Sequence, residues 1–343
     1  MSLSAAKLRL LIVTGPLHPL IGGLETAVDV LAGELVALGQ EVIVVTLTPS
    51  NAPDASAYGI CRRPSLLAHF RLFMWADCVL VQGLILKMAW PQFFFRSRMF
   101  VTHQGMYPSG QRFGWLRDLL SKRVTHVAIS HAVGATLPTR YELIYNPYAA
   151  ETFYPRQAAR RPRSLIFVGR LVPEKGAATL LEAVASLRRA GFECTLTIAG
   201  EGPQRLELEA LIQSHDLAGQ VFLAGSVVGD ALAELFSAHQ VAVVPSLWPE
   251  PLGIVALEAI ACGCHVIGTS QGGLPEAIGD CGVVVPNGDV AALAQAIEDA
   301  LSAPPDEAAA ARRLKHLGKF QPRAVAQRYL DLFRQGGLAA VAS

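Results

Sequence analysis

The stretch that decides the fold is VAVVPSLWPEPLGIVALEAIAC, residues 241–262. Its first residues, Val241–Val244, form an apolar β-branched run that predicts a short buried strand. The run from Ile254 to Cys262 is rich in Ala, Leu and Ile and predicts a buried helix. Glu250 therefore falls in the loop from strand to helix, and Glu258 lies about one and a half turns into the helix.

The loop before this helix has the features of an anion site. Backbone N–H groups near Leu252 and Gly253 have no partner within the predicted helix. These groups and the helix dipole attract anions to that end of the helix. The carboxylates of Glu250 and Glu258, on either side, accept hydrogen bonds from hydroxyl groups. The stretch therefore predicts a binding site for a sugar diphosphate.

The rest of the 343-residue chain repeats this alternation of short apolar strands and helices. A chain of this length exceeds what one hydrophobic core usually supports, so two domains are expected. The alternation favours an α/β fold of two doubly wound, Rossmann-like domains with parallel sheets. A stretch rich in Pro and Arg, residues 149–163, is the expected linker. The expected strands are Leu10–Val13, Val42–Thr46, Cys78–Val81, Met99–Thr102, His126–Ile129 and Leu143–Tyr145 in one sheet, and Ser164–Val168, Thr195–Ala199, Val221–Leu223, Val241–Val244, His265–Ile267 and Gly282–Val285 in the other; the clearest other helices are Thr26–Leu38, Ala177–Arg189 and Pro322–Gln335.

Composition narrows the class of protein. No run reaches the roughly 18 to 20 apolar residues that a membrane span needs, and the apolar opening, Leu8–Val13, is too short for a signal sequence. The six cysteines lack a Cys-x-x-Cys spacing, so reduced thiols and a cytoplasmic location are expected. Residues 1–160 carry 15 Lys and Arg against 9 Asp and Glu, whereas residues 161–343 carry 14 against 19. Either the two halves meet different partners, or this difference in charge is ordinary scatter.

Glycines and basic residues follow other predicted strands. Gly22-Gly23 precede a predicted helix, where a backbone approaches a phosphate closely; a simple turn is the alternative. Arg170 and Lys175 follow the first strand of the second half, at the sheet edge where open α/β folds bind ligands. Their charges can neutralise a diphosphate leaving group. The alternative is a solvated pair beside Glu174.

Two further segments are candidates for the same cleft. His103 directly follows a strand of the first half. A lone histidine there is usually structural or exposed, but its place at the carboxyl edge of the sheet favours a functional role equally. The run GGLPE, residues 272–276, is a glycine pair before a short helix, at the rim of the cleft or in a turn.

Together these segments resemble the large retaining glycosyltransferase family four, of GT-B fold. The resemblance spans nearly the whole chain, and its specific parts are the two-glutamate segment and the Gly-Arg…Lys-Gly segment, residues 169–176. It implies two domains facing across a cleft. An acceptor domain is expected over 1–155, a donor domain over 156–320, and a C-terminal helix that crosses back to the first domain over 321–343.

The resemblance also implies roles for individual residues. Arg170 and Lys175 are expected to hold the donor diphosphate and to stabilise its departure. Glu250 is expected to contact the transferred sugar, Glu258 the ribose, and His103 to position the sugar near its anomeric carbon. The other residues expected to bind the donor, largely through backbone groups, are Gly22, Gly23, Gly200, Gly202, Val227, Leu252, Gly253 and Ile254.

The implied reaction moves a hexosyl unit from a UDP or GDP sugar to a glycan or lipid-linked acceptor, with retention of the anomeric configuration. The sequence contains no Asp-x-Asp, so neither a metal nor another cofactor is expected. Same-face attack is implied, in which the leaving phosphate accepts the acceptor's proton. The alternatives are a GT-B-fold sugar-nucleotide epimerase and a non-catalytic nucleotide-sugar-binding subunit. Near-neutral charge and the absence of a recognisable module argue against nucleic-acid binding.

Aromatic residues and arginines alternate in part of the first half. Residues 66–75, LLAHFRLFMW, are interpreted as a core helix over the sheet, with contact to a bilayer as the alternative. The preferred candidate for peripheral attachment to the inner face of the cytoplasmic membrane is a nearby basic patch. Its residues are Arg96, Arg98, Arg117, Lys122 and Arg123.

Overall fold

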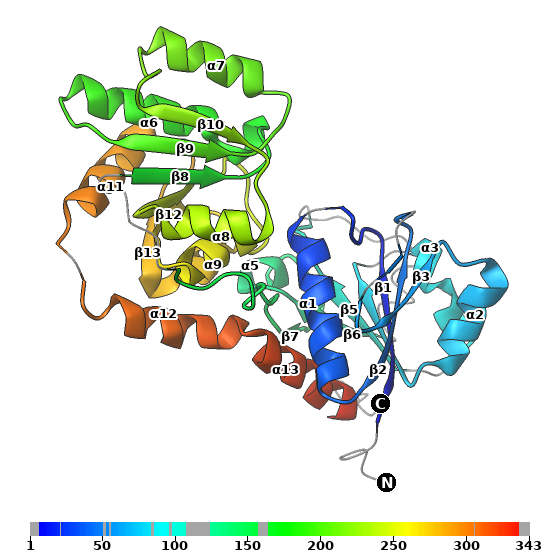
Figure 1. Ribbon diagram of the computed structural model, residues 1–343. Helices are drawn as coiled ribbons and strands as arrows, with labels where there is room; N and C mark the ends of the chain where they lie inside the picture. Colours follow the sequence, from blue (N-terminus) through cyan, green and yellow to red (C-terminus); the bar gives the residue numbers. More distant parts are fainter. Residues whose placement is uncertain are drawn as a thin grey trace. The chain divides into compact units, whose positions relative to one another are not determined.

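The computed structural model divides the chain into two compact units, each built on one parallel sheet (Figure 1). Unit 1 comprises Met1–Tyr148 and Lys319–Ser343, and unit 2 comprises Ala149–Gly318. The sequence analysis had placed the corresponding boundaries after residues 155 and 320. The residues that the structure describes are 7–20, 22–50, 53–54, 56–83, 86–95, 98–107, 124–156, 164–304 and 306–335.

Unit 1 contains a seven-stranded parallel sheet with the order β3-β2-β1-β4-β5-β6-β7. All the strands expected here form, and the sequence missed only β3. This edge strand has four half-buried or exposed residues, so it carries no alternation of apolar and polar side chains. The strands are β1 (Arg9–Thr14), β2 (Glu41–Thr46), β3 (Gly59–Arg62), β4 (Cys78–Gln82), β5 (Arg98–His103), β6 (Thr125–Ala128) and β7 (Glu142–Leu143).

The two faces of this sheet are covered by different helices. Alternate residues of β1 point to opposite faces: Leu10 and Ile12 pack with α1 and α13, whereas Leu11 and Val13 pack with Phe73 of α2. The helix α13 lies beside α1 (Figure 1), so the C-terminal segment belongs to the core of unit 1. The helical elements are α1 (Gly23–Ala37), α2 (Leu66–Trp75), α3 (Leu86–Ala89), η1 (Trp90–Phe93), α5 (His131–Gly134), η4 (Gly318–Phe320) and α13 (Pro322–Gln335).

Polar contacts attach α13 to the sheet of unit 1. The hydroxyl of Tyr329 lies 2.9 Å from Oγ1 of Thr102, and Nη1 of Arg98 donates to the carbonyl of Phe333 at 3.1 Å. Arg98, expected in the basic patch, therefore caps carbonyl groups at the end of a helix. The other four residues of that patch lie outside the described residues.

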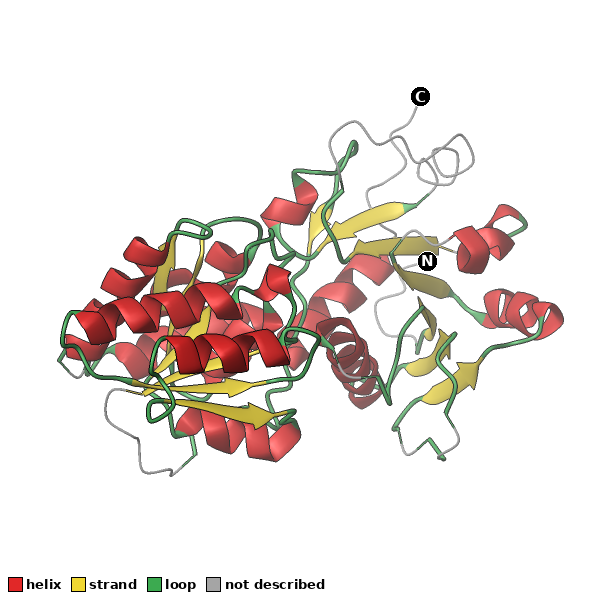
Figure 2. Cartoon of the chain, turned by 90° about the horizontal axis from the view of Figure 1, so that it is seen from above, coloured by secondary structure: helices red, strands yellow, loops and turns green. Residues whose placement is uncertain are grey.

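Unit 2 contains a six-stranded parallel sheet with the order β10-β9-β8-β11-β12-β13. Each strand expected in this half forms, and β10 and β12 extend two residues further than expected. Figure 2 shows the strands of this unit between helices. The strands are β8 (Ser164–Val168), β9 (Thr195–Ala199), β10 (Val221–Gly225), β11 (Val241–Val244), β12 (His265–Thr269) and β13 (Gly282–Val285).

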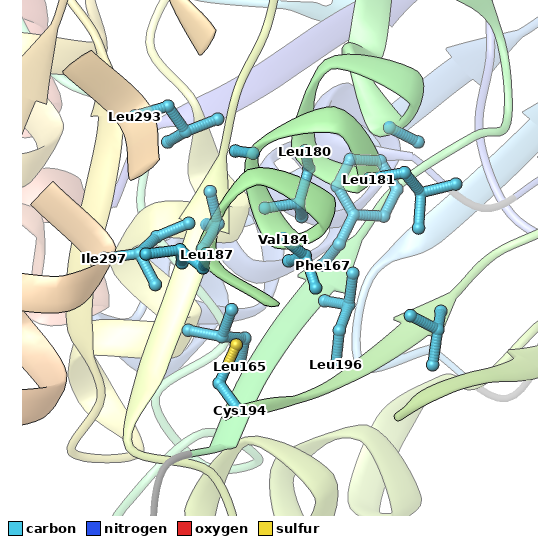
Figure 3. Close-up of a cluster of buried hydrophobic side chains, with 14 of the residues drawn as sticks. Leu165, Phe167, Leu180, Leu181, Val184, Leu187, Cys194, Leu196, Leu293 and Ile297 are labelled. Atoms are coloured by element: carbon cyan, nitrogen blue, oxygen red, sulfur yellow. The ribbon is translucent and has the colours of Figure 1, made fainter. Parts of the chain in front are cut away.

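The core of unit 2 joins β8 and β9 to α6 and α11. Leu165 and Phe167 of β8 face Leu180 and Val184 of α6, with Ile297 of α11 beside them (Figure 3). On the sheet's other side, α9 and α10 pack against β12. The helical elements are η2 (Pro173–Lys175), α6 (Ala177–Arg189), α7 (Arg205–Ser214), α8 (Gly229–Ser237), α9 (Ile254–Ala261), α10 (Leu274–Ile278), η3 (Gly279–Cys281), α11 (Val290–Ser302) and α12 (Ala309–Leu317).

The expected α/β architecture, with two Rossmann-like units, is thus confirmed. Among the described residues, no helix is both long and apolar enough to cross a bilayer.

Candidate active site

Lys175 and Glu250 form an ion pair at the carboxyl edge of the sheet in unit 2. Nζ of Lys175 lies 2.5 Å from Oε1 of Glu250, and the hydroxyl of Ser246 donates to the same oxygen at 2.8 Å. The Glu250 side chain is 10% exposed and that of Lys175 is 25% exposed. Lys175 follows β8 and Glu250 follows β11, and because these strands are neighbours, their loops meet. Two residues expected to act on different parts of the donor are therefore in direct contact.

Arg170 provides a second cation on the loop that carries Lys175. Its side chain is exposed, and it has no hydrogen-bonding or ionic partner among the described residues. An exposed guanidinium without a carboxylate keeps all its N–H donors for an incoming anion. The loop after β8 thus presents one paired and one unpaired positive charge.

Close backbone contacts hold the loops of this edge together. Gly176 has φ +73°, and a Cβ there would lie 2.0 Å from the carbonyl oxygen of Pro245. A Cβ on Gly200 would lie 1.8 Å from the carbonyl oxygen of Gly169. Gly200 and Gly202 were expected to border the nucleobase, and the structure places both against the loop after β8. Their observed contacts shape that loop, and contact with a base stays a prediction.

The N-terminus of α9 lies where the sequence predicted it. Gly253 is the N-cap with φ +91°, Leu252 is buried, and Ile254 begins the helix. Glu258 is half-buried one turn further on, and its carboxyl group has no hydrogen-bond partner among the described residues. Burial raises the pKa of its carboxyl group to about 8, which favours the protonated form.

The glycine pair of the loop between β12 and α10 supports Glu250 through the main chain. Gly272 forms an isolated parallel bridge with Glu250, and the N–H of Gly273 donates to the Glu250 carbonyl at 2.6 Å. The sequence predicts either a turn or a position at the rim of the cleft for this pair. Val227, expected near the nucleobase, is half-buried in the loop between β10 and α8.

In unit 1, the expected Gly22-Gly23 segment begins α1. Gly22 is the N-cap in an extended conformation, and the carbonyl of Gly22 accepts from the N–H of Thr26 at 3.1 Å. The carboxylate of Glu25 lies close to Gly22, because a Cβ on this glycine would be 2.5 Å from Oε2 of Glu25. A side chain of the helix itself therefore occupies space beside the expected phosphate site.

His103 is fully buried, which the sequence did not indicate. Its Nδ1 lies 2.8 Å from the Tyr107 hydroxyl and its Nε2 lies 2.8 Å from Nδ1 of His126. Burial, together with the neighbouring His126, lowers the pKa of His103 to about 3, so the ring stays neutral. Both ring nitrogens of His103 have protein partners. Tyr107, which is half-buried, is more exposed than either His103 or His126.

A group of amide side chains lies at the same edge of the sheet in unit 1. Nε2 of Gln104 donates to Oε1 of Gln82 at 2.8 Å, and Nδ2 of Asn146 donates to Oε1 of Gln104 at 2.7 Å. Gln82 and Asn146 are buried. Sequence reasoning missed this group, as it missed Tyr107 and His126. The one available signal was that Gln82 and Gln104 each stand at the end of a strand.

The comparisons with known proteins come from both sequence and structure. Residues 151–316 match the model of the family Glycosyl transferases group 1. The glycogen synthase of Mycobacterium tuberculosis is 35% identical over 231 residues, which is 60% of this chain and 55% of the relative. The phosphatidylinositol N-acetylglucosaminyltransferase gpi3 subunit of Schizosaccharomyces pombe is 26% identical over 301 residues, covering 76% of this chain and 65% of that protein. The chain thus spans just over half the length of the glycogen synthase that it matches.

Solved structures match nearly the whole chain. A glycosyltransferase from Rickettsia africae ESF-5 has a TM-score of 0.83 at 18% identity, covering 97% of this chain and 99% of the other. Anabaena Alr3699/HepE in complex with UDP and glucose has a TM-score of 0.76 at 18% identity, covering 94% and 98%. At this level of identity, the likeness establishes the fold, which is that of the GT-B glycosyltransferases.

Proposed function

We propose that the chain is a GT4-like glycosyltransferase, as its match to the group 1 family model and to a glycogen synthase supports, and that it moves a hexosyl unit from a nucleoside diphosphate sugar to a glycan or lipid-linked acceptor. The proposal includes retention of the anomeric configuration and independence of metal ions. The observation that carries it is the Lys175–Glu250 ion pair beside the unpaired Arg170. This arrangement combines positive charge for a diphosphate with a fixed carboxylate for sugar hydroxyls.

Lys175 and Arg170 would together stabilise the departing diphosphate. The Lys175 ammonium has three N–H donors and uses one on Glu250. Its remaining donors and the guanidinium of Arg170 would take up the charge that develops on the diphosphate as the bond from the anomeric carbon to the phosphate oxygen breaks. The Glu250 side chain would not have to change position when the donor binds, because Ser246 and Lys175 already hold its carboxylate in place.

The acceptor hydroxyl would form the new bond on the face that the diphosphate leaves. The electron pair of the breaking bond goes to the phosphate oxygen, which also takes the acceptor's proton. Oε2 of Glu250 would accept a hydrogen bond from a sugar hydroxyl, and Glu258 would accept from the ribose. Neutral His103 would act through the Tyr107 hydroxyl rather than by ring contact with the sugar.

UDP-glucose is the first donor to test, since Anabaena Alr3699/HepE, which shares the fold, binds UDP and glucose in its solved structure. The purified chain is incubated with UDP-glucose or GDP-mannose and a panel of glycosides, with and without EDTA. Formation of a new glycoside with the donor's anomeric configuration, read by proton NMR coupling constants, is expected and should withstand EDTA. An inverted product, or activity restored only by a divalent ion, contradicts the corresponding part of the proposal.

Variants tie the activity to the site. Arg170→Ala should lower transfer by about 10²–10³-fold, because it removes charge stabilisation that acts in the transition state. Arg189→Ala, an arginine of α6 outside the site, is the matched control. Conversion of the nucleotide sugar into an epimer without any acceptor would instead assign the chain to the epimerases. Donor binding without any turnover would assign it to non-catalytic subunits.

We also propose a cytoplasmic location at the inner face of the membrane, where a nucleotide sugar and a lipid-linked acceptor are both available. Fractionation of cells that produce the tagged full-length chain tests this location.

A further inference from the structure

The helix α2 covers the sheet of unit 1, as its interpretation as a core helix predicts, but it also exposes much of its own apolar surface. Of its ten residues, only His69 and Phe73 are buried. Leu66 is 74% exposed, Leu67 is 59% exposed and Met74 is 55% exposed. Phe73 joins the buried core beneath the helix, and Leu72 and Trp75 are partly buried against it. A soluble surface rarely gathers large apolar side chains in this way unless they contact something.

An aromatic group continues this surface beyond the helix. Phe94, just after η1, is 69% exposed. Its ring centroid lies 6.2 Å from that of Phe70 and 6.0 Å from that of Trp90. Phe94 is therefore held in place by neighbouring rings. We call the surface formed by Leu66, Leu67, Met74 and Phe94 the α2 face.

Exposed arginines lie on and just before α2, and the acidic residues nearby, Asp54 and Asp77, are paired with Arg62 and Arg9. Residues 62–76 contain three arginines and no Asp or Glu. Arg62 is engaged by Asp54 at 2.6 Å, whereas Arg63 and Arg71 are exposed. In Figure 1, α2 lies on the opposite face of the unit 1 sheet from α1. Exposed apolar side chains bordered by arginines match the interface of an anionic bilayer, where the rings enter the headgroup region and the cations meet lipid phosphates.

We propose that the α2 face docks this protein on anionic lipid bilayers, with α2 lying in the plane of the interface. Charge complementarity selects this occupant over a neutral protein surface, because the arginines at its border have a partner in every anionic headgroup. The docking deepens the proposed function, since it places the chain where a lipid-linked acceptor would be met. It requires neither donor nor acceptor, so its test is separate from that of transfer.

The test is sedimentation of the full chain with vesicles, without any donor. Vesicles of phosphatidylcholine and phosphatidylglycerol are compared with vesicles of phosphatidylcholine alone, at low and high salt. Binding to the anionic vesicles that weakens with salt is expected. Leu67→Gln combined with Phe94→Gln should reduce the partition constant by about tenfold or more, because both side chains lose their apolar burial. Arg71→Gln should reduce it by about fivefold.

A matched control separates the α2 face from general surface effects. Leu206, in α7 of unit 2, is 77% exposed, and Leu206→Gln should leave vesicle binding unchanged. All variants should keep the thermal midpoint of the parent chain and its rate of UDP-glucose turnover with soluble acceptors. Vesicle binding that is absent, or equally weakened by Leu206→Gln, overturns the proposal. So does light scattering that shows a dimer without vesicles which Leu67→Gln dissociates, because the face would then belong to a second copy.

Discussion

The carboxyl edges of the two sheets differ in the side chains that their central loops carry. In unit 2, the edge carries the Lys175–Glu250 ion pair and Arg170, which is unpaired within the described part of the chain. In unit 1, the middle of the edge carries buried His103 beside His126 and amides that bond to one another, while the charged Glu25 and the Arg62–Asp54 ion pair lie beside α1 and β3. Both edges come from the same sheet architecture, so the difference lies in side chains placed on equivalent loops.

This contrast bears on the proposed transfer reaction. A charged edge suits the diphosphate that must leave, because fixed charges stabilise charge that develops there. Amide side chains suit uncharged groups such as sugar hydroxyls, because they can donate and accept hydrogen bonds. We expect the largest effect at the Lys175–Glu250 ion pair, followed by the packing of the loops around it, the buried His103 and finally Glu258.

The largest effect is expected on the ion pair. Lys175→Ala leaves the Glu250 carboxylate without its cation, and Glu250→Gln leaves the ammonium without its anion. Each change should lower the transfer rate by about 10²–10³-fold. Glu174→Gln changes the exposed neighbour and should have little effect. Steady-state assays with a nucleotide sugar measure these rates, and equal losses in Glu174→Gln and Glu250→Gln would remove the special role of the pair.

The next effect concerns the loops that hold the charged edge. Gly200→Ala places a methyl group 1.8 Å from a backbone oxygen, where no side chain can move aside. The free energy of unfolding should fall by roughly 1–3 kcal/mol or more. Gly219→Ala, where a Cβ meets nothing within 4 Å, should be nearly neutral. Urea unfolding followed by circular dichroism compares the two, and similar stabilities would contradict the close packing.

The stability of unit 1 should depend on pH through the buried His103. The pKa of His103 is lowered to about 3 in the fold, whereas an unfolded histidine titrates near 6.5. The unfolded state therefore binds more protons between these values, so stability is full above about pH 6.5 and falls as pH drops, by up to about 1.4 kcal/mol per pH unit. His103→Gln should remove this part of the loss between pH 7 and pH 5. Exposed His131→Gln is the control, and thermal melts that lose stability equally in both variants would refute the assignment.

The smallest effect is expected in nucleotide affinity through Glu258. Its carboxyl group has a pKa of about 8 without donor, and hydrogen bonds from ribose hydroxyls favour the ionised form. Binding should therefore release a proton near pH 7, and the affinity for UDP should rise severalfold as pH rises towards 8, then level off. Calorimetry in buffers of different ionisation enthalpy measures the proton. Glu258→Gln should abolish this pH dependence, and an unchanged profile in that variant would contradict the role.

Much of the architecture was predicted from local patterns. The helices Ala177–Arg189 and Pro322–Gln335 form with the predicted bounds, and the predicted helix start after Gly253 is observed. Apolar periodicity and glycine positions report on neighbours a few residues away. The edge strand β3 escaped prediction, because it has no buried face to produce such a pattern.

The sequence by itself determined the two α/β units, the family resemblance and the set of charged residues at the second edge. Only the tertiary structure decided that Lys175 meets Glu250, that His103 is buried against His126, and that α2 turns leucines to the surface. The physical reason is the distance along the sequence over which each kind of interaction acts. Secondary structure follows from residue types within a few positions, whereas ion pairs, burial and exposed faces depend on which strands are neighbours in the sheet and which helices cover them.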